Sequence, residues 1–163
     1  MNNQPRDRGQ QWLEEFLRLS SLPAEVIATQ TYESNDDKPS YWLTIDQTKL
    51  TPKQIENLIG ADGTVLDSIQ YLANTMLNLS RDDEEQAAYT VELDGYRLRR
   101  QEELRALADH AAQKVRETGQ EYEMRSLSSA ERRQVHTFLK ECDDLETQSR
   151  GQEPDRRLVV RLR

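Results

Sequence analysis

Residues 58–70 read LIGADGTVLDSIQ, and the two glycines within them, Gly60 and Gly63, organise the first half of the chain. Apolar residues recur at helical spacing on both sides of the glycines. Glycine adopts positive φ without steric cost, so it suits a tight turn between two helices. The stretch therefore predicts a helix that ends at Gly60, a short turn through Ala61 and Asp62, and a second helix directly after Gly63.

The turn from Gly60 to Gly63 has two interpretations. As a simple connection it supplies positive φ and nothing more, and for an isolated tetrapeptide this is the commoner case. As a binding loop it lets a phosphate approach the backbone, because the free N–H groups and the positive dipole end of the helix starting at Thr64 point towards it. The carboxylate of Asp62 repels such a phosphate. The flanking elements have to decide between the two.

Those elements predict a mixed module in the first half of the chain. Thr51 followed by Pro52 is a helix start, because a hydroxyl cap precedes a proline at the first helical position. The other predicted elements are a helix at 10–19, hairpin strands at 25–31 and 40–46 with their turn at 33–39, and a strand at 89–93. The order strand, strand, helix, Gly-x-x-Gly, helix, strand favours the binding interpretation of the turn.

The second half predicts a long helix, a short strand, a capped helix and two closing strands, over residues 96–118, 122–124, 128–141, 145–149 and 158–162. Gly119 stands where a C-terminal cap belongs. Ser128 with Glu131 three residues later fits a capping box. Both halves combine helices with short strands, so the predicted fold class is α+β, with two abutting modules.

Charge is distributed unevenly along the chain of 163 residues, whose formal net charge is −8. Residues 1–94 contain 7 Lys and Arg against 17 Asp and Glu, whereas residues 95–163 contain 15 against 13. The basic residues of the second part are mostly arginines, whose planar fork matches phosphate. We therefore expect nucleic acid to bind only at a local patch there, while the acidic first part limits indiscriminate binding.

Composition also excludes several classes of function. The single cysteine, Cys142, excludes an internal disulfide and a cysteine metal cluster within one chain. No apolar run approaches the roughly 20 residues that span a bilayer, and residues 1–11 lack the apolar core of a signal peptide. Walker, HExxH and nucleophile-elbow motifs are missing. We expect a cytoplasmic protein that is not an enzyme, needs no metal or cofactor, and does not bind membranes.

Candidate phosphate ligands occur on the predicted helix 128–141 and on the last strand. Arg132 and His136 are four residues apart and share one helix face with Arg133 beside them, so a guanidinium and an imidazole can hold one phosphate. An ordinary exposed pair gives the same pattern. On the last strand Arg157 and two further arginines share one face, which predicts either a solvated strand face or a basic edge of the same phosphate site.

Three motifs together resemble the bacterial Jag (KhpB) family: residues 58–74 around the glycines, the Asp-Gly-Tyr-Arg of 94–97, and the Glu-Arg-Arg-Gln-Val-His of 131–136. The Arg-x-x-x-His spacing in the last motif gives the family's C-terminal module, the R-three-H domain, its name. The resemblance extends from about residue 20 to the end. It implies a helical extension at 1–21, a KH domain with a three-stranded sheet at 22–95, and a small α/β R-three-H domain at 96–163.

The resemblance implies a non-catalytic bacterial regulator that binds single-stranded RNA, or single-stranded DNA, in a family linked to cell elongation, cell shape and division. It assigns the RNA backbone to the turn 60–63, and a phosphate of a single strand to Arg132 and His136. From the basic residues themselves we expect Arg133 and Arg157 to contribute to the same site. A small single-KH protein is the implied partner.

Two departures from the family pattern modify this expectation. Relatives usually carry a basic residue between the glycines, so we expect the KH half to contribute shape and a weak backbone contact. Many relatives also have a further N-terminal domain, whose membrane-linked roles we do not expect here. The alternative is a protein-interaction module whose acidic KH half docks a partner and binds RNA weakly or not at all.

Overall fold

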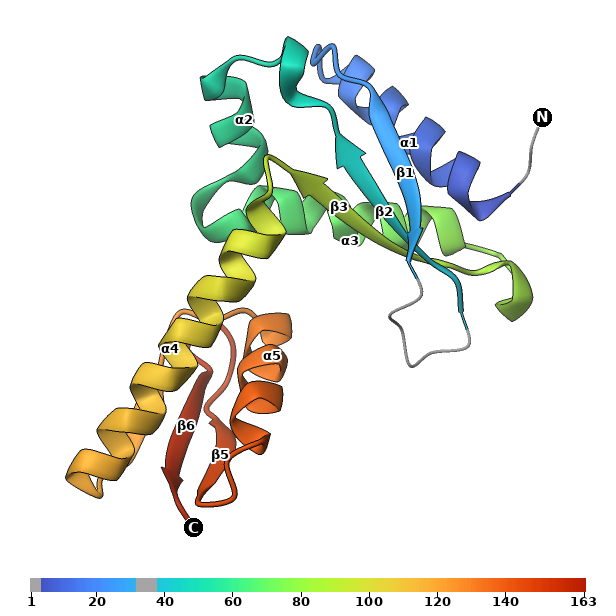
Figure 1. The fold of residues 1–163 in the computed structure, drawn as a ribbon. Helices are drawn as coiled ribbons and strands as arrows, with labels where there is room; N and C mark the ends of the chain where they lie inside the picture. The colour runs from blue at the N-terminus through green and yellow to red at the C-terminus, as the bar shows by residue number, and fades with distance from the viewer. Residues whose placement is uncertain (1–3, 32–37) are drawn as a thin grey trace. The chain divides into compact units, whose positions relative to one another are not determined.

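The computed structural model describes residues 4–31 and 38–163, and the chain divides into two compact units (Figure 1). Unit 1 comprises Met1–Arg97 and unit 2 comprises Leu98–Arg163. Within the described residues each unit combines helices with a three-stranded sheet, so the predicted α+β class is confirmed. In this part of the chain no helix has both the length and the apolar character needed to cross a membrane.

The helices and strands of unit 1 are α1 (Pro5–Leu19), β1 (Val26–Thr31), β2 (Ser40–Ile45), α2 (Pro52–Ile59), α3 (Thr64–Asn78) and β3 (Ala88–Leu93). In the sheet β1 pairs antiparallel with β2, and β2 pairs parallel with β3. The predicted pairing of the first two strands is thus confirmed. Residues 33–37 of their predicted turn lie outside the described residues.

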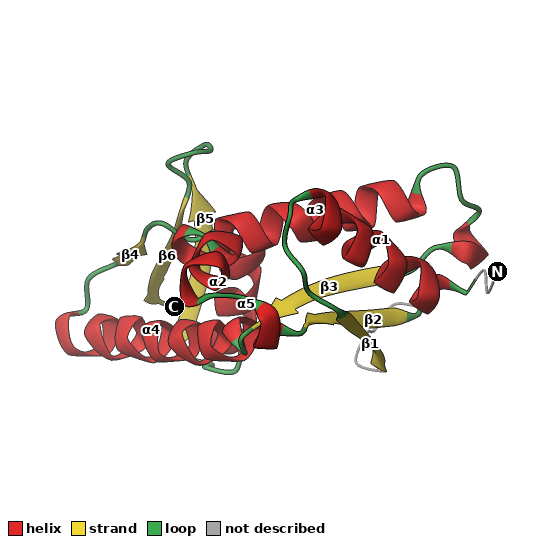
Figure 2. Cartoon of the chain, turned by 90° about the horizontal axis from the view of Figure 1, so that it is seen from above, coloured by secondary structure: helices red, strands yellow, loops and turns green. Residues whose placement is uncertain are grey.

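The core of unit 1 lies between the sheet and helices α1 and α3, which pack on the same face (Figure 2). Leu13 and Leu17 of α1 are fully buried in this core. The predicted extension, residues 1–21, therefore contributes to the core of unit 1. Helix α1 also begins earlier than predicted and includes Gly9. A glycine fits at this position because it faces the ring of Tyr89, where an added Cβ would come within 3 Å of the ring carbons.

Three amide side chains of α3 close the edge of the sheet at β3, and we call them the amide ladder. The pairs are Asn78 with Ala87, Asn74 with Tyr89, and Gln70 with Val91. Each asparagine accepts the strand N–H at 2.9 Å and donates to the carbonyl of the same residue at 2.7–2.8 Å. Four helical residues and two strand residues both advance by roughly 6–7 Å, so the register holds over the two steps between the three pairs. The ladder fixes α3, and with it the glycine turn, against the sheet.

Unit 2 contains most of α4 (Tyr96–Thr118), followed by β4 (Tyr122–Met124), α5 (Ser129–Lys140), β5 (Leu145–Arg150) and β6 (Arg157–Leu162). Strand β6 is central and pairs antiparallel with both neighbours. The predicted capping box is present, since Ser128 Oγ accepts the N–H of Glu131 at 3.2 Å and the Glu131 carboxylate accepts the N–H of Ser128 at 2.8 Å. Leu158 and Val160 of β6 are buried in the core with residues of α4 and α5. Alternate residues of β6 therefore face away from the helices.

Candidate nucleic-acid interface

Arg132 is buried rather than displayed on the surface, with only 6% of its side chain exposed. Its Nη1 donates to the carbonyl oxygens of Leu127 at 2.8 Å and Arg156 at 3.3 Å. Its Nη2 forms an ion pair and a hydrogen bond with the carboxylate of Glu153. The predicted phosphate ligand is thus a buried cation that joins the start of α5 to the connection between β5 and β6.

A pocket of about 310 Å³ opens beside Arg132, between α5 and the strands β5 and β6. Its lining residues are Ser129, Arg132, Arg133, His136, Thr147, Ser149, Arg156 and Leu158. The Nδ1 atom of His136 is hydrogen-bonded to the Thr147 hydroxyl, and Arg156 Nε donates to Ser149 Oγ at 2.7 Å. Guanidinium groups, an imidazole and hydroxyls are the side-chain donors that suit a phosphate. The structure therefore brings the predicted Arg132, Arg133 and His136 together in one anion-suited pocket.

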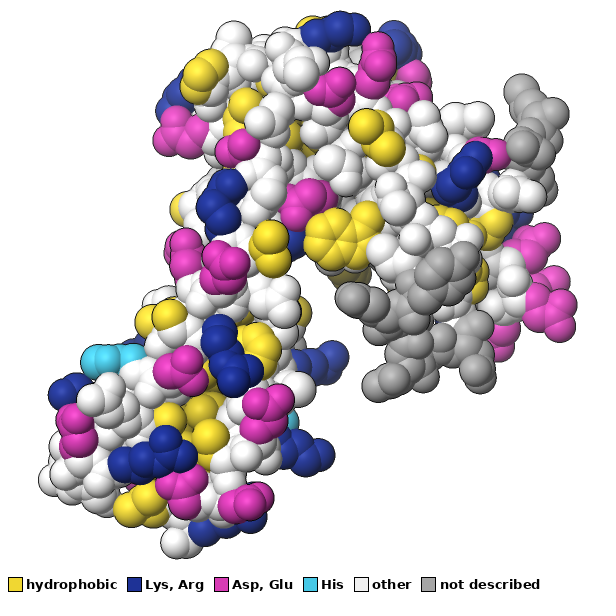
Figure 3. Space-filling view, viewed as in Figure 1, with side chains coloured by type: hydrophobic (Ala, Val, Ile, Leu, Met, Phe, Trp, Pro, Cys, Tyr) yellow, Lys and Arg dark blue, Asp and Glu magenta, His cyan; other side chains and the backbone are white. Residues whose placement is uncertain are grey.

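Arg157 does not belong to this pocket, and its place is taken by Arg156. The side chain of Arg157 is on the face of β6 that turns away from the helices, where its Nη1 donates to Glu123 of β4 at 2.9 Å. Hydrogen bonds from Arg125 and Arg157 hold the pKa of Glu123 below its usual value. Because strand side chains alternate, one residue of difference moves a side chain to the opposite face. Basic and acidic side chains are interspersed on the visible surface of unit 2 (Figure 3).

The glycine turn adopts the backbone geometry that its residues predict. Gly60 and Gly63 have φ of 74° and 75°, and Asp62 between them has φ of 52°. Gly63 is buried against Tyr96, whose ring carbons would lie within 3 Å of an added Cβ, so a side chain does not fit there. Ala61 and Asp62 are exposed. Whether this turn contacts RNA stays a prediction, and the turn belongs to unit 1 whereas the pocket belongs to unit 2.

Sequence reasoning missed four residues that shape the pocket or hold Arg132, namely Arg156, Thr147, Ser149 and Glu153. Alternation along the predicted strand 145–149 places Thr147 and Ser149 on one face, which was an available signal. The contact of Glu153 with Arg132 spans 21 residues and leaves no local pattern. Among the described residues, no group of three His, Cys, Asp or Glu side chains is arranged to hold a metal ion.

The pocket and the small sheet around it correspond to a known domain. Residues 102–162, which lie within unit 2, match the family model of the R-three-H domain. That range contains α5, β5, β6 and every residue that lines the pocket. The chain therefore carries an R-three-H domain.

Curated relatives with a common name match a longer part of the chain. The chain is 35% identical over 106 residues to the RNA-binding protein KhpB of Clostridium symbiosum. The aligned region covers 65% of this chain and 47% of that protein. The chain is 31% identical over 126 residues to the RNA-binding protein KhpB of Bacillus subtilis (72% and 60%), and 31% over 106 residues to that of Lactiplantibacillus plantarum (65% and 32%).

The chain thus spans between 32% and 60% of the length of these relatives. Their alignments are longer than the range 102–162, so they extend into the residues before the R-three-H domain. The domain match and the relatives together support the resemblance to the Jag/KhpB family.

Proposed function

We propose that this chain is a non-catalytic RNA-binding protein that holds phosphates of single-stranded RNA in the pocket of its R-three-H domain. The observation that carries the proposal is the pocket itself, which gathers cationic side chains and hydroxyls between α5 and the β5–β6 connection. The name of the relatives, RNA-binding protein KhpB, supports RNA as the ligand. Phosphate contacts carry little sequence information, so this pocket contributes affinity and position rather than sequence preference.

Three side chains make the first contacts in this proposal. Arg133 and His136 are exposed one helical turn apart on α5, and Arg156 is exposed at the end of the β5–β6 connection. The hydrogen bond to Ser149 holds the guanidinium of Arg156 at the pocket, so little side-chain freedom is lost when a phosphate binds. Leu158, which is 3% exposed, supplies an apolar part of the pocket lining.

Unit 1 is assigned here to a KH domain with a supporting role. Its element order, its mixed sheet and its Gly-x-x-Gly turn with positive φ at both glycines support this assignment. KH domains clamp a nucleic-acid backbone at such a turn. The exposed carboxylate of Asp62 opposes a phosphate there, so unit 1 adds a weak backbone contact. Its protein partner in this proposal is a small single-KH protein, as the family resemblance implies.

Fluorescence anisotropy with a short single-stranded RNA tests the function, at two salt concentrations of roughly 50 and 200 mM. Arg156→Ala is compared with a change of the next residue, Arg157→Ala, whose side chain lies on the face of β6 away from the helices. We expect Arg156→Ala to weaken binding of all sequences alike and to lower the slope of log affinity against log salt by roughly 0.7, the value for one phosphate contact on a single strand. Arg157→Ala should bind as the wild type does. Absence of RNA binding at low salt, or equal effects of the two variants, would contradict the proposal.

A further inference from the structure

Arg132 is charged, is held in place by hydrogen bonds, and lies at the pocket, yet its charge is already engaged in the free protein. Two backbone carbonyls and the carboxylate of Glu153 take its Nη donors. A phosphate that enters the pocket therefore meets a guanidinium whose nearest anion is a carboxylate of the same chain. The carbonyls fix where the guanidinium lies, whereas Glu153 is the one partner that carries a negative charge.

Glu153 is the partner that can leave. Its side chain is 59% exposed, and residues 151–156 around it are all exposed to solvent. A carboxylate in this setting regains water when its ion pair opens, so the pair is weak compared with a buried one. The two carbonyl partners belong to backbone that is fixed by the start of α5 and by β6. Opening the Arg132–Glu153 pair therefore exposes the guanidinium without removing the contacts that orient it.

We propose that Glu153 occupies the place of an RNA phosphate on Arg132, and that binding exchanges the carboxylate for the phosphate. This inference rests on the proposed function of the pocket. A phosphate and a carboxylate both present two oxygens to the guanidinium fork, so one replaces the other without moving Arg132. Glu153 is then a positioning residue that keeps Arg132 in place before RNA arrives and lowers the affinity of the pocket by competing with the ligand.

The exchange has a second consequence for specificity. An isolated anion must displace Glu153 at one site, whereas an RNA strand also gains contacts with Arg133, His136 and Arg156. The competing carboxylate therefore disfavours single small anions more than it disfavours a polyanion. Free phosphate should bind this pocket poorly in the wild type.

Glu153→Gln tests the exchange, because glutamine keeps the acceptor oxygen and removes the charge. The matched control is Glu146→Gln, which removes the same charge from an Arg-paired glutamate of β5 that pairs with Arg161 on the face away from the pocket. We expect Glu153→Gln to bind single-stranded RNA about three- to tenfold more tightly at low salt, as for removal of one charge a few ångströms from a phosphate. Its salt slope should match that of the wild type, because both chains form the same phosphate contact with Arg132 when RNA binds. Glu146→Gln should leave both values unchanged.

Several results would overturn the exchange. Equal or weaker binding by Glu153→Gln, with the melting temperature kept, would make Glu153 a purely structural partner of Arg132. Tighter binding with a salt slope steeper by roughly 0.7 would show that only the variant contacts a phosphate through Arg132, so that the wild type keeps Glu153 on Arg132 when RNA is bound. As a measurement on the unaltered chain, the side-chain NMR resonances of Arg132 should shift on RNA addition, and resonances that stay in place would also refute the exchange. Failure of every variant, and of the wild type, to bind RNA would instead overturn the proposed function itself.

Discussion

Replacing Asn74 with alanine should destabilise unit 1 strongly, although the side chain is one neutral amide. Asn74 Oδ1 accepts the N–H of Tyr89 at 2.9 Å, and Nδ2 donates to the Tyr89 carbonyl at 2.7 Å. Tyr89 is only 2% exposed, so water does not readily replace either contact. Alanine would leave one backbone donor and one backbone acceptor of β3 without a partner.

The size of the effect follows from these two groups. An unsatisfied buried polar group costs about 1–3 kcal/mol, and the higher helix propensity of alanine returns about 0.5 kcal/mol. We therefore expect the free energy of unfolding of unit 1 to fall by about 2–4 kcal/mol. Domains have total stabilities of about 5–15 kcal/mol, so the variant should stay folded without denaturant.

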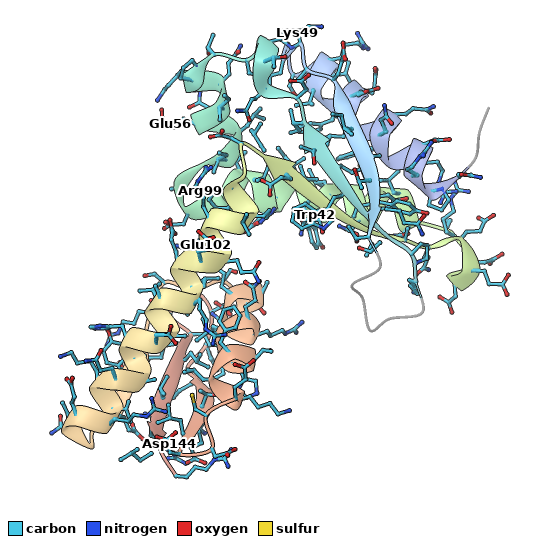
Figure 4. All side chains as sticks on the ribbon, in the orientation of Figure 1. Trp42, Lys49, Glu56, Arg99, Glu102 and Asp144 are labelled. Carbon is cyan, nitrogen blue, oxygen red and sulfur yellow. The ribbon has the colours of Figure 1, made fainter. Side chains whose placement is uncertain are left out.

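Urea unfolding followed by tryptophan fluorescence measures this loss in unit 1 alone. The two tryptophans of the chain are Trp12 in α1 and Trp42 in β2, both in unit 1. Trp42 is labelled in Figure 4. With a denaturant dependence of about 2 kcal/mol per molar, the middle of the usual range, the midpoint should fall by roughly 1–2 M. Thr75→Ala is the control, because it removes a polar group from the next, exposed position of α3. A fall in midpoint of less than about 0.3 M for Asn74→Ala would show that the amide ladder does not stabilise the sheet edge.

Three further outcomes can be checked on the same chain. Gly63→Ala should lower the stability of unit 1 by more than the roughly 1 kcal/mol that we expect Gly119→Ala to cost unit 2. Both glycines have positive φ, but of the two only Gly63 is crowded. Urea midpoints measure the two losses. Asp62→Lys should tighten binding of single-stranded RNA at low salt if the glycine turn faces the backbone, and unchanged affinity in an anisotropy titration would exclude the turn from the interface. Hydrogen bonds from Arg116 lower the pKa of Asp144, so the stability from this pair is present above the unfolded pKa and is lost as the pH falls through the folded pKa. The melting temperature of Asp144→Asn should therefore lie below that of the wild type at pH 7, and the difference should shrink as the pH falls through the folded pKa of Asp144.

Local sequence signals predicted most elements of the fold. Pro52 after Thr51 and the Ser128–Glu131 capping box set the starts of α2 and α5, because these signals act within one helical turn. The start of α1 was missed because its first turns are polar and include Gly9. The fit of Gly9 depends on Tyr89 of β3, which lies far along the sequence. The amide ladder was missed for a similar reason, since asparagines in a helix are ordinarily read as solvent-facing.

The binding site was predicted only in part, and the missing part is tertiary. Arg132 and His136 follow from helical spacing, but nothing in that spacing says that Arg132 is buried by Glu153 and by the carbonyl of Arg156, which lie 21 and 24 residues away. The selection of Arg157 instead of Arg156 missed the pocket by one position, because the inward face of β6 is set by contacts with the helices of unit 2. Period-2 alternation gives the two faces of a strand and leaves open which of them turns inward.

The amide ladder also determines how the sheet of unit 1 ends. A strand at the rim of a sheet exposes backbone donors and acceptors on which another chain can add, and proteins that leave such a rim long and unprotected are prone to aggregate. Along β3 and at Ala87 just before it, those groups are already bonded by Asn78, Asn74, Gln70 and Arg97, so a foreign strand would have to displace α3 before it could pair there. The side-chain amides of α3, together with the guanidinium of Arg97, thus protect unit 1 against edge-to-edge polymerisation at β3.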